Sequence, residues 1–122
     1  MNDIMDQLRD LDIEVDEALE RLSGDEKLYV KLLNTFFDEE PLKGLKASFT
    51  SKNPSDEYRL AHNMKGSSLN LGLLPIADLA IEMLQLLRDH KEEEAISFLP
   101  EFERSFNDFY AKIKPIIKEE EP

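Results

Sequence analysis

The sequence predicts an all-α protein, with an antiparallel up-down four-helix bundle and short additional helices at the N-terminus. Three observations lead to this fold class. Apolar residues recur every three or four positions almost from end to end, as on one face of a helix. No stretch shows the period-two alternation that a half-buried strand requires. Loops of only a few residues join the long helical stretches, which favours antiparallel neighbours.

The N-terminal part is expected to form two short helices. Their apolar sides comprise Ile4, Leu8 and Leu11 in the first, and Val15, Ala18, Leu19 and Leu22 in the second. Gly24 is a typical stop signal for the second helix. We interpret residues 1–10 as a helical extension, residues 11–118 as the bundle and residues 119–122 as an acidic tail.

The first long helix should begin after a cap formed by Ser23 or Asp25. Pro41 is expected to kink this helix without ending it, because the apolar stripe continues to Phe49. The side predicted to be buried comprises Leu28, Tyr29, Leu32, Leu33, Phe36 and Phe37.

The next helix has clear signals at both ends. Asn53 is a good N-cap, Pro54 suits the first helical position, and Gly72 is placed to end the helix after Leu71. Pro75 can then open another helix that reaches to about residue 90. Its inward residues are predicted to be Ile76, Leu79, Ala80, Met83, Leu84 and Leu87.

The last helix should begin near Glu92 and carry a seam of large apolar residues. Pro100 and Pro115 are expected to bend it or break it locally. The seam comprises Leu99, Phe102, Phe106, Phe109, Ile113 and Ile116.

Composition excludes several classes of function. The 122 residues contain 15 Lys and Arg against 27 Asp and Glu, a net charge of −12 that disfavours nucleic acid and anionic membranes as partners. Without cysteine there are no disulfides, thiolate nucleophiles or cysteine-based metal sites. Asp3 and Asp6 stand where a secretory leader would be basic, and no apolar run resembles a membrane span. We therefore expect a cytoplasmic monomer.

No pattern for ordinary enzyme chemistry is present. Neither His62 nor His90 lies in a Glu-x-x-His motif, so a di-iron bundle is not supported and we expect no metal. The sequence also lacks a glycine-rich phosphate loop, and we expect no cofactor.

One segment, AHNMKGSSLNLG at residues 61–72, contains side chains that could take part in a reaction. At 100° per residue its apolar and small residues (Leu60, Ala61, Met64, Ser67, Ser68 and Leu71) fall on the core side. His62 then points outward, in one strip with Tyr58, Lys65 and Leu69 and with Gly66 on its flank.

This strip suits a phosphoryl carrier. A neutral imidazole is a nucleophile at cellular pH, and a phosphoryl group bound to it needs a nearby cation, which Lys65 could supply. Glycine costs about 1 kcal/mol in a helix interior, so Gly66 suggests the close approach of another backbone. Residues 43–65 hold five basic residues, including Arg59, but only two acidic ones.

Simpler interpretations remain open at this point. His62 is compatible with an ordinary surface histidine, and Gly66 with close packing of two helices. Tyr58 and Leu69 are equally compatible with partly buried core positions. His90 is best explained as a favourable cation at a helix C-terminus.

The segment resembles the signature of histidine-containing phosphotransfer (HPt) domains, in which Ala-His-x-x-Lys-Gly-Ser/Ala precedes a small polar stretch and Leu-Gly. The similarity extends upstream to LERLSGDEKLYVKLLNTFFDE and downstream into the helix after Ile76, over roughly residues 11 to 115. It implies a four-helix bundle that carries a phosphoryl group between receiver-domain aspartates in multistep two-component signalling. A hybrid sensor histidine kinase and response-regulator receiver domains would be the partners, and the Mg²⁺ site would belong to the receiver.

Carried over by position, His62 would accept the phosphoryl group, Lys65 would stabilise it and Gly66 would give clearance for the partner. Tyr58, Leu69 and Arg59 would complete the docking patch. Many members have Gln or Glu on the facing helix 22 positions after the histidine, whereas this chain has Leu84 there, followed by Gln85. The alternatives are a docking or scaffold module whose histidine is never phosphorylated and a histidine kinase fragment, which would lack an ATP-binding domain.

Overall fold

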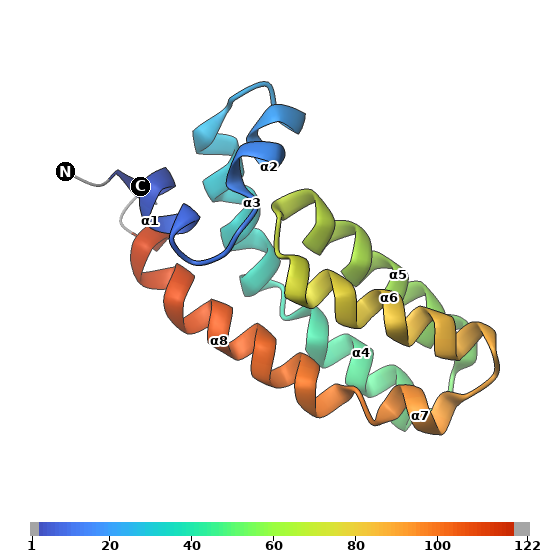
Figure 1. The fold of residues 1–122 in the computed structure, drawn as a ribbon. Helices are drawn as coiled ribbons and strands as arrows, with labels where there is room; N and C mark the ends of the chain where they lie inside the picture. Colours follow the sequence, from blue (N-terminus) through green and yellow to red (C-terminus); the bar gives the residue numbers. More distant parts are fainter. Residues whose placement is uncertain (1–2, 119–122) are drawn as a thin grey trace.

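The computed structural model describes residues 3–118, and the predicted acidic tail at residues 119–122 lies outside them. Within this range the chain is helical and contains no strand, which confirms the all-α class (Figure 1). The helices are α1 (Ile4–Arg9), α2 (Val15–Arg21), α3 (Glu26–Asp38), α4 (Pro41–Thr50), α5 (Pro54–Leu71), α6 (Leu74–Arg88), α7 (Glu92–Ile96) and α8 (Leu99–Ile117).

Four helices form the bundle. Each of α4, α5, α6 and α8 packs against the next in this order, and α8 packs back against α4. Successive members run in opposite directions, and α3 continues the line of α4 beyond the end of the bundle (Figure 1). At that end α1 contacts α8, while α2 contacts α3 and α5. The N-terminal helices therefore cover one end of the bundle.

The predicted cap residues act through identifiable contacts. The side chain of Asp25, and not that of Ser23, accepts a hydrogen bond from the backbone N–H of Leu28 at the start of α3. Asn53 does the same for the N–H of Asp56 at the start of α5. Gly72 ends α5 with a φ of +79°, and its carbonyl accepts a hydrogen bond from the N–H of Glu14 at 3.0 Å.

The expectation that Pro41 only kinks a continuous helix is wrong. α3 ends at Asp38, Glu40 adopts a left-handed conformation with φ of +48°, and Pro41 is the first residue of α4. Proline disfavours helical geometry in the residue before it and has no N–H to continue the hydrogen-bond ladder. The apolar stripe nevertheless continues, because α4 extends in nearly the same direction as α3 (Figure 1).

The C-terminal segment contains two helices instead of one. Ser97 and Phe98 separate α7 from α8, and Pro100 lies in the first turn of α8, where its missing N–H has no helical partner to lose. Pro115 lies inside α8 without ending it. Within the predicted seam, Leu99 and Ile116 are partly buried, whereas the others (Phe102, Phe106, Phe109 and Ile113) are buried.

Three residues predicted to face the core are at the surface. Leu28 and Leu32 on α3 are each 37% exposed, and Ser67 on α5 is also exposed. The other helices cover only part of the apolar face of α3, because α3 extends past the end of the bundle. Its buried side centres on Tyr29, whose hydroxyl donates to the carbonyl of Leu71 at 2.7 Å.

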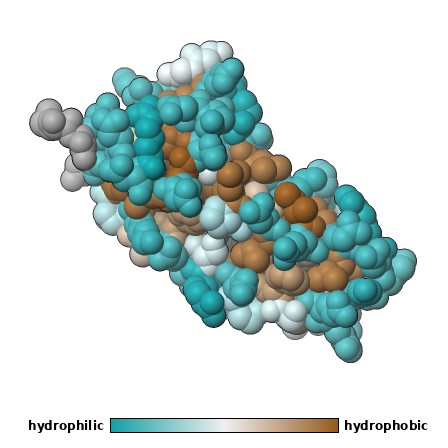
Figure 2. All heavy atoms as spheres, viewed as in Figure 1, coloured by the Kyte–Doolittle hydropathy of each residue, from teal (hydrophilic) through white to brown (hydrophobic). Residues whose placement is uncertain are grey.

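The surface in Figure 2 is mostly hydrophilic, with hydrophobic residues reaching it over α5 and α6 and near their junction with the N-terminal helices. In the part of the chain that the structure describes, no helix is both long and apolar enough to cross a membrane.

Candidate functional site

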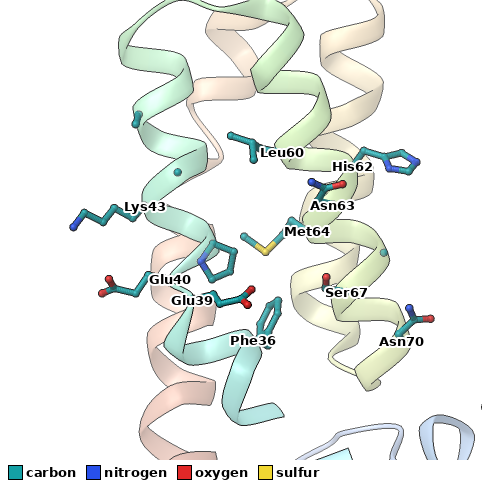
Figure 3. Close-up of a pocket in the computed structure, with 14 residues that line it drawn as sticks. Phe36, Glu39, Glu40, Lys43, Leu60, His62, Asn63, Met64, Ser67 and Asn70 are labelled. Atoms are coloured by element: carbon teal, nitrogen blue, oxygen red, sulfur yellow. The ribbon is translucent and has the colours of Figure 1, made fainter. Parts of the chain in front are cut away.

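His62 lies on the outer side of α5. The side of α5 that faces the bundle is buried and consists of Glu57, Ala61, Met64, Ser68 and Leu71. Ser68 is compatible with the core because its hydroxyl donates to the carbonyl of Met64 at 2.6 Å. His62 is exposed, and Figure 3 shows it projecting on the side of α5 that faces away from α4.

The imidazole of His62 has one neighbouring ring. Tyr58, one turn earlier, stacks with it at a centroid distance of 6.4 Å and an interplanar angle of 23°. Within residues 3–118 no protein group forms a hydrogen bond with either imidazole nitrogen. Both nitrogens are therefore accessible to a reaction partner.

Lys65 and Gly66 follow on the next turn. Lys65 is partly buried, and its ammonium group has no carboxylate within 4.0 Å among the described residues, so its charge is available for another anion. Beyond its two chain neighbours and the adjoining backbone of α5, a Cβ atom built on Gly66 meets no described atom within 4 Å. Packing of helices inside this molecule therefore does not explain a glycine at this position.

The remaining predicted docking residues surround His62. Arg59 is exposed and forms an ion pair with Asp56 at 3.2 Å. Leu69 is 38% exposed, and the structure thus favours a surface position over a core position for it. Tyr58 is partly buried and packs on the edge of the core. Arg21 of α2 fixes the C-terminal end of this strip by donating to the carbonyl of Leu69 at 2.8 Å.

A groove runs beside the histidine, between α5 and the α3–α4 pair (Figure 3). Its volume is about 850 Å³, and His62 and Gly66 lie among its lining residues. Asn63 and Ser67 supply neutral polar groups from α5, and Glu39, Glu40 and Lys43 lie on the opposite wall. The sequence did not predict this groove, because periodicity along one helix does not specify the neighbouring helix.

The facing helix α6 contributes an arginine that the sequence did not single out. Leu84 is buried in the core, and Gln85 lines a separate pocket between α6 and α7 that contains no residue of α5. Arg88, one turn beyond Leu84, reaches across instead, and its Nε donates to the hydroxyl of Tyr58 at 3.2 Å. Arg88 lies four residues after Leu84 and therefore on the same face of the helix, which is the sequence signal that could have identified it.

Glu57 is an unexpected member of the buried side of α5. It is only 4% exposed, and its Oε1 has no hydrogen-bond partner among the described residues. Burial raises the pKa of this carboxyl group, and the nearby charge of Glu92 raises it further. The sequence did not identify Glu57 as a buried residue. Among the described residues, no three or more His, Asp or Glu side chains are grouped in a way that could hold a metal ion.

Comparison with protein-family models matches residues 31–111 to the Hpt domain. No curated protein and no solved structure matches the chain. The match contains α4, α5 with His62, and α6, and it covers about two thirds of the sequence. The family implies histidine phosphotransfer in two-component signalling, by a carrier and not by a conventional enzyme. Because the family model matches well over half of its length, the chain belongs to the Hpt domain family.

Proposed function

We propose that this protein is a phosphorelay intermediate that accepts a phosphoryl group on His62 from a receiver-domain aspartate and passes it to another receiver domain. One observation carries the proposal. His62 is exposed and its imidazole forms no hydrogen bond with a described residue, one turn from Lys65, which pairs with no described carboxylate, and from a glycine with open space around it. This combination lies within the part of the chain that matches the Hpt domain.

The proposed reaction is an in-line displacement at phosphorus. A ring nitrogen of His62 donates its lone pair to the phosphorus of the aspartyl phosphate, the N–P bond forms, and the bond between phosphorus and the aspartate oxygen breaks. The aspartate leaves as a free carboxylate. The phosphoryl group then carries a charge of about −2, which the ammonium group of Lys65 stabilises. Transfer to the next receiver reverses these steps, and the receiver supplies the Mg²⁺-dependent site.

The partner would dock over the outer side of α5 and the adjoining groove. Tyr58 and Leu69 offer apolar contact and Gly66 gives clearance. Lys65 supplies positive charge close to His62, next to Arg59, which pairs with Asp56. Such charges complement the acidic site of a receiver domain. A hybrid sensor histidine kinase is the proposed source of the phosphoryl group, and a monomer in the cytoplasm remains the predicted form of the protein.

The rival proposal is a docking module whose histidine is never phosphorylated. Incubation with a receiver domain phosphorylated with labelled phosphate separates the two. We expect transfer of label to the wild type, with the acid lability and alkali stability of phosphohistidine, and no transfer to His62→Gln. The matched control is His90→Gln, which changes the other histidine at an exposed position after α6. Label on His62→Gln, or loss of label only in His90→Gln, would contradict the assignment.

A further inference from the structure

Tyr58 lies between His62 and an arginine of the facing helix. Its ring stacks with the imidazole at a centroid distance of 6.4 Å. Arg88 of α6 donates from Nε to the tyrosine hydroxyl at 3.2 Å, and its guanidinium carbon lies 5.9 Å from the centroid of the tyrosine ring. These contacts connect α6 to the imidazole through a single side chain.

This connection restricts an otherwise free imidazole. An exposed histidine can rotate about two side-chain bonds, and no hydrogen bond from a described residue fixes the ring of His62. A contact between aromatic rings favours one orientation over others by about 2- to 10-fold. The orientation of Tyr58 is itself set by the partial burial of its ring and by Arg88.

Among the described residues, no other polar side chain of α6 forms a hydrogen bond or ring contact with Tyr58 or His62. Leu84, at the position facing α5, is buried and apolar, and Gln85 lies in the pocket between α6 and α7. Arg88 is on α6 and contacts both the hydroxyl and the ring of Tyr58, the residue that stacks with His62.

We propose that Tyr58, held by Arg88, is a positioning residue that orients the imidazole of His62 for attack on phosphorus. The proposal rests on the phosphotransfer function given above. In-line displacement depends on the direction of the attacking lone pair, so loss of the ring contact should reduce the rate of transfer within the docked complex. A residue that serves docking alone would change the affinity for the receiver instead.

The test uses Tyr58→Leu, which removes the ring, and Tyr58→Phe, which keeps the ring and removes the hydroxyl. Arg88→Gln removes the guanidinium group. Two exposed residues of α8 provide matched controls, Tyr110→Leu and Arg104→Gln. For each variant, phosphotransfer is measured against receiver concentration, to separate the saturating rate from the half-saturating concentration. The NMR chemical shifts of the His62 ring protons and the melting temperature are also measured for each variant.

We expect Tyr58→Leu to lower the saturating rate about 5- to 10-fold, and Tyr58→Phe and Arg88→Gln to lower it about 2- to 3-fold. The controls should keep the wild-type rate. The His62 ring protons should change their chemical shifts in Tyr58→Leu, because the ring current of the tyrosine is lost, but not in Tyr110→Leu.

Two results would overturn the positioning role while leaving the proposed function intact. The first is a wild-type saturating rate in Tyr58→Leu with a raised half-saturating concentration, which would make Tyr58 a docking contact only. The second is unchanged His62 ring shifts in Tyr58→Leu. If the wild type accepts no phosphoryl group from any receiver, the proposed function fails and the positioning role fails with it.

Discussion

Substitutions at Gly66 should affect the stability of the free protein and the recognition of a partner in opposite directions. A Cβ atom at this position meets nothing within 4 Å, so Gly66→Ala introduces no clash. What remains is the gain in helix propensity and the smaller conformational entropy of the unfolded chain, about 0.5 to 1 kcal/mol together. For a chain of this size we expect the melting temperature to rise by about 2 to 5 °C.

Bulk at the same position should have the opposite effect on phosphotransfer. The open space at Gly66 is where the proposed partner must approach His62, and a misplacement of about 1 Å in the docked complex costs roughly 100-fold in rate. We therefore expect Gly66→Gln to fold normally and to slow receiver-dependent transfer by about 100-fold or more. A small phosphodonor needs no such clearance, so its reaction with His62 should change little.

Two other glycines and one alanine calibrate the experiment. Gly44→Ala should also stabilise, since its Cβ would lie at 4.0 Å from Leu60 Cδ1, an ordinary contact distance. Gly72→Ala should destabilise, because φ is +79° and the Cβ would come within 2.6 Å of the Glu14 carbonyl oxygen. Ala111→Gln adds an exposed side chain on α8 and should leave transfer unchanged. Unfolding of Gly66→Gln, or normal transfer per folded molecule, would refute the reasoning.

Two further predictions concern charge. Lys65→Ala should slow transfer or shorten the lifetime of the phosphorylated form by an amount equivalent to about 1 to 3 kcal/mol, measured as decay of label, whereas Lys31→Ala, an exposed lysine of α3, should not. Burial raises the pKa of Glu57 in the folded protein, so the contribution of this group to the free energy of unfolding falls as pH rises above about 4.5. Glu57→Gln should therefore gain stability over the wild type with rising pH, in urea titrations from pH 4 to pH 8. A constant difference across that range would show that the Glu57 carboxyl does not titrate differently on folding.

Sequence alone predicted the elements that depend on local chemistry. The start of α5 at Asn53 and Pro54 and its end at Gly72 follow from capping and from glycine's tolerance of positive φ. The break at Glu40 was missed because a continuous apolar stripe is compatible with either a kinked helix or two nearly collinear helices. Only the left-handed backbone of Glu40 distinguishes the two.

The parts of the site that depend on neighbouring helices could not be predicted in this way. Helical periodicity assigned His62 to the outer side of α5, and the structure also has it there. Arg88 lies 26 residues further along the chain, and its contact with Tyr58 exists only because α5 and α6 pack side by side. The burial of Glu57 likewise depends on what covers the start of α5, which the sequence of α5 does not contain.

The charge distribution gives the His62 region an electrostatic environment unlike that of the whole chain. The molecule carries a net charge of −12, yet Lys65 lies on α5 and Arg88 reaches it from α6, beside Arg59, which pairs with Asp56. At an ionic strength of 0.1 M charges are screened beyond about 10 Å, so an approaching acidic site interacts mainly with the nearest groups. Close to His62 these groups include Lys65, which no carboxylate of the described chain neutralises. A protein that is acidic as a whole can therefore still attract an acidic partner to one side chain, and repel it elsewhere.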